Sequence, residues 1–189
     1  KELLAQAIHS SSVRRHGPFV TLNCGAANDE VLAAELFGYV EGAFTDAAKG
    51  GRTGKLELAH GGTLLLDEVD AMSPKMQVSL LRVLEEGRIT RVGAERPVAV
   101  DLRVIAASNE DLQMAITQKR FRLDLYHRLG ALFIRLPSLK ERTDDILILS
   151  RHLLPQLGFS SLRLSNDALA LLKRYHWPGN VRELRNVLL

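Results

Sequence analysis

The sequence predicts an α/β fold with a mainly parallel sheet and helices on both faces, followed by a small helical domain. Along the first part of the chain, short apolar runs typical of buried strands alternate with helical patterns. The strongest run, Gly61 to Glu68, opens with two glycines and ends in two carboxylates, as expected of a strand buried on both faces. After Pro137 the pattern is helical only. We therefore expect one domain at 1–137 and a second at 138–189.

Spacing and capping signals define the individual elements. Apolar residues at helical spacing predict a first helix over 2–8. Asn28 can cap a helix that ends at Phe37, and Pro74 in a first turn favours a helix that ends at Glu86. We expect strands at 19–22, 61–68, 88–92, 98–100, 102–107 and 131–136, and the remaining helices at 54–60, 111–118, 121–129, 144–157, 165–175 and after 179.

Composition narrows the class of protein. Hydrophobic residues make up 46% of the 189, so a packed core is feasible and global disorder is not expected. The 25 Lys and Arg exceed the 22 Asp and Glu by 3, a surplus too small to predict a nucleic-acid surface. Cys24 is the only cysteine, which excludes an internal disulfide and suits a reducing compartment. No apolar run has the length of a membrane span and no secretory signal is visible, so we expect a cytoplasmic protein.

Two adjacent carboxylates close the Gly61 to Glu68 run. Ligands of open parallel sheets gather at the carboxyl ends of the strands, so Asp67 is a candidate Mg²⁺ ligand and Glu68 could polarise an attacking water. The alternative is a strand that ends in two solvated acids, and from this stretch alone both interpretations stand. Asn109 follows the strand at 102–107 and could touch the same ligand; its alternative is to cap the helix at 111–118.

Four glycines interrupt the pattern between Gly38 and Arg52. They surround the stretch Gly42-Ala43-Phe44-Thr45-Asp46-Ala47. In one interpretation Phe44 packs into the core and anchors the loop, and composition alone favours it because most phenylalanines are core residues. In the other, a mobile loop presents Phe44 to a partner.

Two arginines lie in the helix expected at 121–129. Arg122 and Arg128 are six positions apart, so on a straight helix their side chains point about 240° apart. They cannot both reach one point unless the element bends. The alternative is an ion pair between Arg128 and Asp124 at i, i+4.

Four motifs follow one another along the chain. They are Glu35-Leu36-Phe37-Gly38 with Gly42-Ala43-Phe44-Thr45, the run Gly61 to Glu68, the segment Phe121 to Leu129, and Trp177-Pro178-Gly179-Asn180-Val181-Arg182-Glu183-Leu184. In this order they resemble the hallmark loop, Walker B, arginine-finger and sensor II motifs of the central AAA+ ATPase domain of sigma-54-dependent transcriptional activators, the enhancer-binding proteins of the nitrogen regulatory protein C type. The resemblance covers nearly the whole chain. It implies an AAA+ P-loop αβα sandwich that starts at the last Walker A residue, and a helical lid truncated at its C-terminal end.

The resemblance also implies a site for ATP and Mg²⁺. Lys1 would be the last residue of the Walker A loop, with its ammonium on the β and γ phosphates. Asp67 would hold Mg²⁺ and Glu68 would orient the attacking water. Asn23 would be a switch that can hydrogen-bond Glu68. Asn109 would be sensor I and Arg182 would be sensor II. Arg122 and Arg128 would contact the γ phosphate of a neighbouring subunit.

Partners follow from the same resemblance. Arginines that act on a neighbour imply a homo-oligomeric ring, in this family usually a hexamer. The hexapeptide Gly42 to Ala47 would engage the sigma-54 RNA polymerase holoenzyme, so that ATP hydrolysis opens promoter DNA. Asp46 stands where the family has glycine and adds a negative charge beside the tip. In this family a DNA-binding domain normally lies beyond the end of such a chain and a signal-responsive domain before its start.

Two other functions stay open. The first is a non-hydrolysing assembly module, motivated by Asp46 and by the absence of Walker A glycines before Lys1. The second is a helix-turn-helix DNA reader at 177–189, although this segment supplies one helix and a turn and no basic recognition helix follows. Both ends lie inside helical patterns, so we expect a piece of a larger protein. By itself this piece should bind ATP weakly or not at all.

Overall fold

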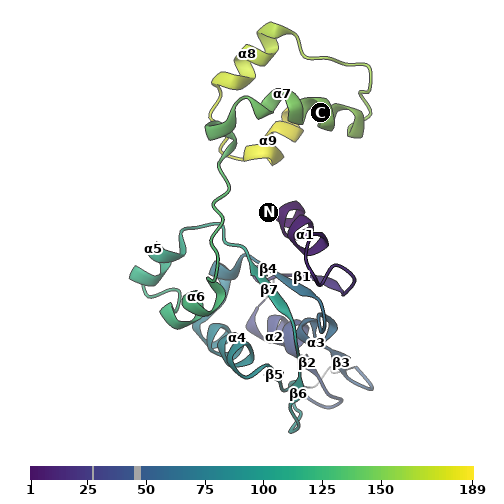
Figure 1. Cartoon of the computed structure of the whole chain (residues 1–189), viewed down its shortest axis with the longest axis vertical. Helices are drawn as coiled ribbons and strands as arrows, with labels where there is room; N and C mark the ends of the chain where they lie inside the picture. Colours follow the sequence, from purple (N-terminus) through teal and green to yellow (C-terminus); the bar gives the residue numbers. More distant parts are fainter. Residues whose placement is uncertain (27, 45–47) are drawn as a thin grey trace. The chain divides into compact units, whose positions relative to one another are not determined.

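The computed structural model describes residues 1–26, 28–44 and 48–189 (Figure 1). The chain forms two compact units, Lys1–Phe133 and Ile134–Leu189, each with a hydrophobic core of its own. The division lies a few residues before the joint that the sequence predicts after residue 137. Within the described ranges, every helix is too short or too polar to span a membrane.

A three-stranded parallel sheet organises unit 1. Its order is β1 (Phe19–Asn23), β4 (Thr63–Asp67) and β7 (Arg103–Ala106), with β4 in the middle. Leu64, Leu65 and Leu66 of β4 are all buried. Because successive strand residues point to opposite faces, both faces of β4 are covered. This confirms the predicted α/β class and the parallel sheet.

In the part of unit 1 that the structure describes, six α-helices lie around this sheet (Figure 1). Helix α1 (Glu2–Ser10) contacts β4, α3 (Lys55–Leu58) contacts β1, and α6 (Leu123–Leu129) contacts β7. The others are α2 (Asp29–Phe37), α4 (Pro74–Glu86) and α5 (Leu112–Thr117). The predicted cap of α2 forms, since Asn28 accepts from Val31 N–H at 3.0 Å. Helix α4 begins at Pro74 and ends at Glu86 as predicted, and Ser73 caps it by accepting from Met76 N–H at 3.3 Å.

Two short antiparallel ribbons extend unit 1. One joins β5 (Arg88–Ile89) to β6 (Val98–Ala99), which confirms the predicted hairpin in a shorter form. The other joins β2 (Gly38–Tyr39) to β3 (Arg52–Thr53) and closes the base of the glycine-rich loop, which the sequence did not predict. Gly38 has φ +75°, and a Cβ there would lie 2.4 Å from the carbonyl oxygen of Arg52. The ribbon therefore requires glycine at this position.

The strand expected at 131–136 is wrong. These residues pair with no strand in the described chain, and β7 ends the sheet on this side. The apolar side chains that predicted a strand are exposed, with Leu132 at 79% and Phe133 at 59%. A strand needs a paired edge, and an apolar pattern alone does not supply one.

Unit 2 is helical, as predicted. It contains the short 3₁₀ helix η2 (Leu139–Arg142) followed by α7 (Asp145–Gln156), α8 (Asn166–Arg174) and α9 (Asn180–Val187). Trp177 lies in its core, 2% exposed, and donates its indole N–H to the Leu172 carbonyl oxygen at 2.8 Å. The tryptophan of the predicted sensor II motif thus anchors the core that α9 joins. Leu139, Ile146, Leu153 and Leu184 complete that core.

The burial of β4 generates a stability prediction. Leu64→Ala should lower the free energy of unfolding by about 2–5 kcal/mol, because it leaves a cavity under a fully buried strand. Leu3→Ala, at a position 84% exposed on α1, is the matched control and should change it by no more than about 0.5 kcal/mol. Urea unfolding followed by circular dichroism measures both, and equal losses for the two variants would contradict the assigned core.

Candidate functional site

The carboxyl ends of the three parallel strands bring polar residues together at one edge of the sheet. Asn23 at the end of β1 lies opposite Asp67 at the end of β4 in the strand register. The chain continues the ladder beyond the strands, because Cys24 N–H donates to Asp67 O at 2.8 Å and Val69 N–H donates to Ala107 O at 3.0 Å. The edge predicted to hold a ligand therefore forms from β1, β4 and β7.

The turn after β4 places the second carboxylate in a strained backbone. Glu68 has φ 56° and ψ 45°, a left-handed conformation that is uncommon for a residue other than glycine. Its N–H donates to Asp67 Oδ1 at 3.0 Å, and the 3₁₀ helix η1 (Val69–Ala71) follows directly. Both carboxylates are half-buried. Backbone strain of this kind is typical of sites where function fixes a side chain.

Glycine makes room for the Glu68 carboxylate. A Cβ on Gly25 would lie 2.5 Å from Glu68 Oε2, so a side chain at position 25 would displace the carboxylate. The Asn23 amide oxygen accepts from Gly25 N–H at 2.7 Å. Among the described residues no hydrogen bond joins Asn23 to Glu68; the Asn23 amide oxygen is bonded to the Gly25 turn, which lies beside the Glu68 carboxylate. Sequence reasoning missed Gly25, although a glycine two residues after a strand-ending asparagine is a turn signal that could have pointed to it.

Lys1 and Asn109 meet at the same edge. The Lys1 ammonium donates to the Ser108 carbonyl oxygen at 2.6 Å and to the Asn109 amide oxygen. The Asn109 backbone N–H donates to Asp70 Oδ1 at 3.1 Å, so the loop after β7 is tied to η1. Sequence reasoning also missed Asp70, because its contact with Asn109 joins residues that are far apart in the sequence.

The alternative role of Asn109 as a helix cap is wrong. Helix α5 begins at Leu112, and its cap is Asp111, which accepts from Gln113 N–H at 2.8 Å. The Asn109 side chain is thereby left for Lys1.

The edge carries a concentrated negative charge. Burial raises the pKa of the Cys24 thiol to about 12, and the nearby Asp67, Asp70 and Glu68 carboxylates add to that increase. Cys24 therefore stays a neutral thiol at physiological pH, and the same charges favour a bound cation.

Magnesium fits this donor set. Mg²⁺ prefers oxygen ligands and usually takes one or two carboxylates, with waters and phosphates completing its shell. Asp67 supplies such a carboxylate next to an open edge. Among the described residues, no group of three or more His, Cys, Asp or Glu side chains could hold a metal ion by itself.

The two arginines of the α6 segment contact different partners. Arg122 precedes α6 in an extended conformation and donates to both Asp124 oxygens, at 3.0 and 2.6 Å. This pair raises the pKa of Arg122 and lowers that of Asp124. Arg128 donates from Nε to the Leu84 carbonyl oxygen at 3.1 Å. The alternative interpretation, an Arg128–Asp124 pair, is therefore wrong, because the helix starts after Arg122 and leaves Arg122 within reach of the Asp124 carboxylate.

Phe44 lies at the surface on a tyrosine. Its side chain is 44% exposed, and its ring centroid lies 4.8 Å from that of Tyr39, which is 8% exposed. Gly42 has φ +78° and open space around it, while Ala43 approaches Gly93 of the β5–β6 hairpin. Phe44 thus rests on the core rather than inside it. Thr45, Asp46 and Ala47 lie outside the described residues.

The base of this loop is fastened to the β5–β6 hairpin. Val40 N–H donates to Val92 O at 3.0 Å, and Val92 N–H donates to Gly38 O at 2.9 Å. Next to this contact, Arg91 forms a two-pronged ion pair with Glu57 of α3, at 2.7 and 3.0 Å. The backbone bonds at Val92 therefore join the loop to the hairpin, and the Arg91–Glu57 pair joins the hairpin to α3.

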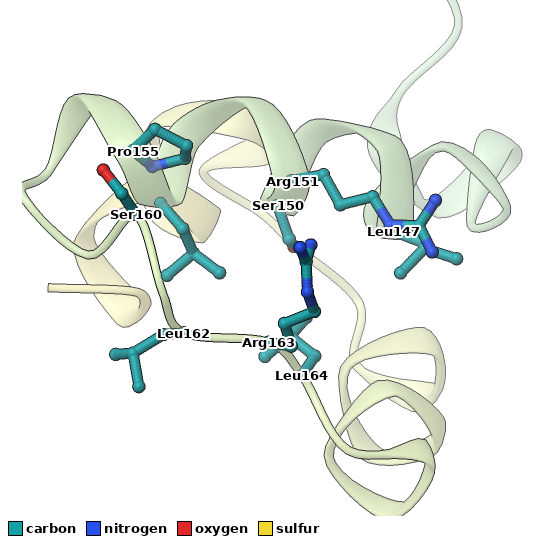
Figure 2. A pocket seen from close by; sticks show the side chains of 9 residues that line it. Leu147, Ser150, Arg151, Pro155, Ser160, Leu162, Arg163 and Leu164 are labelled. Carbon is teal, nitrogen blue, oxygen red and sulfur yellow. The ribbon is translucent and has the colours of Figure 1, made fainter.

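Unit 2 carries Arg182, the last of the predicted site residues, and a small hollow elsewhere on its surface. Arg182 is exposed on α9. The hollow has a volume of about 80 Å³, and Figure 2 shows Ser150 and Arg163 among its lining side chains. The Ser150 hydroxyl is buried and has no protein partner among the described residues. At this volume the hollow holds a few waters and is too small for a nucleotide.

Comparisons with known proteins agree with the geometry. Residues 1–135 match the Sigma-54 interaction domain, and residues 140–189 match the AAA+ ATPase lid domain. The whole chain is 52% identical over 194 residues to a protein named limonene hydroxylase from Geobacillus stearothermophilus. It is 49% identical over 191 residues to the Nif-specific regulatory protein of Azotobacter vinelandii. The chain spans 36% of the length of each of these relatives.

A solved structure shows the same fold. The crystal structure of NtrX from Brucella abortus in complex with ATP matches all of this chain with a TM-score of 0.89 and 39% identity, over 43% of the NtrX chain. The lid match covers the segment 177–189, where the sequence had left a DNA reader open. Together with the ordered motifs, the match over residues 1–135 confirms the resemblance. The chain belongs to the sigma-54 interaction domain family of AAA+ proteins, followed by its lid.

Proposed function

We propose that this domain hydrolyses ATP at the carboxyl edge of the sheet and uses the energy to remodel the sigma-54 RNA polymerase holoenzyme. The observation that carries the proposal is the meeting of Lys1, Asn109, Asp67 and Glu68 around one edge, from separate parts of the chain. The ATP complex of the related NtrX supports a nucleotide as the ligand. The sigma-54 match favours this function over a non-hydrolysing assembly module.

Each side chain at the edge has a distinct task. The Lys1 ammonium binds the β and γ phosphates, and Asn109 lies beside it near the γ phosphate. Asp67 holds Mg²⁺, which when bound neutralises phosphate charge. Glu68 orients a water so that its oxygen attacks the γ phosphorus, and it takes the proton as the bond to the bridging oxygen breaks. Asn23 acts on Glu68 through the Gly25 turn.

The remaining positive charge comes from elsewhere. Arg122 and Arg128 are exposed, so they are available to the γ phosphate of a neighbouring subunit. A head-to-tail interface of this kind closes into a ring, and we propose a hexamer. Arg182 of the lid reports the nucleotide state. DNA is bound mainly by a domain outside this chain, and the complex acts in the cytoplasm.

Replacing Glu68 by glutamine tests the hydrolytic role. Glu68→Gln should bind Mg-ATP with parental affinity but lower kcat by about 10²-fold or more, because the amide keeps the size and cannot take a proton. Steady-state phosphate release and binding of a fluorescent ATP analogue measure the two effects in the full-length regulator. Glu86→Gln, an exposed carboxylate at the end of α4, is the control and should leave both unchanged. Parental turnover in Glu68→Gln would contradict the assignment.

Mixing subunits tests whether Arg128 acts on a neighbour. Arg128→Ala should lower turnover while leaving nucleotide binding to a single subunit largely intact. Mixed with Glu68→Gln protein, it should regain part of the lost turnover, because some interfaces then combine an intact Glu68 with an intact Arg128. Loss of nucleotide binding by isolated Arg128→Ala subunits would instead show that Arg128 acts within its own subunit.

Removing the Phe44 ring tests the coupling to the polymerase. Phe44→Ala should keep ring assembly and ATP hydrolysis but lose open-promoter formation, because Phe44 is the exposed aromatic anchor of the loop. Val13→Ala, a fully exposed apolar side chain in another turn, should keep all three activities. The measurements are ATPase rate, capture of sigma-54 with a transition-state nucleotide analogue, and promoter opening. Normal promoter opening by Phe44→Ala would exclude the loop as the effector.

A further inference from the structure

The buried side-chain amide of Gln77 connects two segments. We call residues 67–72 the acidic turn and residues 120–128 the arginine segment. Gln77 lies in the first turns of α4 and is 0% exposed. Its Nε2 donates to the carbonyl oxygens of Met72 and Arg120, each at 2.9 Å. Its Oε1 accepts from the backbone N–H of Arg122 at 2.8 Å. The Gln77 side chain thus uses both of its amide N–H donors and its oxygen acceptor to bond backbone groups of two segments that are far apart in the sequence.

Both of these segments belong to the site. Met72 directly follows η1, which begins at the residue after Glu68. Arg122 is the residue that precedes α6, where its backbone is extended, with φ −81° and ψ 133°. No helical hydrogen bond fixes the N–H of a residue in that position. The Gln77 oxygen therefore supplies the bond that holds Arg122 at the start of α6.

Helix α4 also contacts the second arginine. Near its other end, the Leu84 carbonyl oxygen accepts from the Arg128 guanidinium. Arg122 is thus held through its backbone at one end of α4, and Arg128 through its side chain at the other. Because a helix is stiff over two turns, a displacement of the acidic turn carries the α4 start and the arginine segment with it.

We propose that Gln77 is a positioning residue for hydrolysis: its amide fixes Arg122 relative to Asp67 and Glu68, so that the arginine offered to a neighbour is set by the state of its own subunit's acidic turn. The inference rests on the proposed function, in which Arg122 acts on a neighbouring subunit's phosphate. Gln77 itself touches no nucleotide in this scheme. It acts through the backbone of Arg122.

The test uses the full-length regulator as an assembled ring. Gln77→Met keeps the length of the side chain and removes all three hydrogen bonds. It should lower kcat by roughly tenfold or more, because misplacing a catalytic group by 1 Å can cost on the order of 10²-fold. The affinity of single subunits for a fluorescent ATP analogue should stay within about twofold, because the amide does not contact the nucleotide edge.

Two further variants separate positioning from general stability. In an Arg122→Ala background, Gln77→Met should lower kcat by no more than about twofold further, because residues that act through one another are not additive. Thr63→Val is the matched control, since Thr63 is also 0% exposed and its hydroxyl contacts His9 Nδ1 at 2.9 Å. Thr63→Val should lower the melting temperature without lowering kcat at a temperature well below it.

A readout without catalysis completes the test. Hydrogen exchange at the Arg122 N–H should speed up at least about tenfold in Gln77→Met and remain at the parental rate in Thr63→Val. If Gln77→Met does not fold, Gln77→Asn replaces it, because its amide is one methylene too short to reach the Arg122 N–H, and its loss of kcat should likewise vanish in the Arg122→Ala background. Multiplying losses with Arg122→Ala, or parental exchange at Arg122, would overturn the inference. Parental turnover in Arg122→Ala alone would instead overturn the role of Arg122 in the proposed function, and the exchange measurement would still decide the role of Gln77.

Discussion

The parallel pairing of β4 between β1 and β7 is the constraint on which the rest of unit 1 depends. Parallel strands end at the same edge, so Asn23, Asp67 and the loop that carries Asn109 must meet there. The three leucines of β4 are buried on both faces, which keeps β4 in the middle of the sheet, and the observed register places Asp67 opposite Asn23. The hydrophobic packing of one strand thus sets the geometry of the polar edge.

Local conformations then refine what the sheet brings together. The left-handed backbone at Glu68 turns the chain sharply into η1, and the absence of a side chain at Gly25 leaves space for the Glu68 carboxylate. Asp70 of η1 in turn accepts from the Asn109 backbone. The turn that begins at the strained residue Glu68 is therefore tied to the segment after β7, through Val69 and Asp70. Strain of this order persists only where surrounding contacts compensate for it.

Sequence reasoning succeeded where the physical signal is local. Asn28 caps α2 and Pro74 opens α4 as predicted, because both signals depend on residues within one helical turn. The buried run that forms β4 and the glycines of the loop are also local signals. The order of the motifs then made the family recognisable and allowed the edge residues to be named before the fold was known.

The failures share one cause, which is dependence on distant residues. The apolar run at 131–136 predicts a strand, but pairing depends on a sheet edge elsewhere. Asp124 lies at the right spacing for Arg128, yet Arg122 takes it because the helix starts later than the pattern suggests. In the sequence, Gln77 is one polar residue on an amphipathic helix. Its three hydrogen-bond partners cannot be predicted without knowing how α4 packs against the α6 segment. No local pattern carries such information.

The two ends of β4 lead to two different parts of unit 1. From its carboxyl end the chain passes through η1 to α4, whose side chain and backbone hold the two arginines. Its amino end is preceded by α3, whose Glu57 holds Arg91 beside the hairpin that supports the Phe44 loop. Under the proposed function, a change at the acidic edge would be passed to a neighbouring subunit through the first connection, while the second fastens the loop at the opposite end of the strand. Both connections consist of hydrogen bonds and ion pairs between short rigid elements, which is the kind of contact that can switch between discrete arrangements.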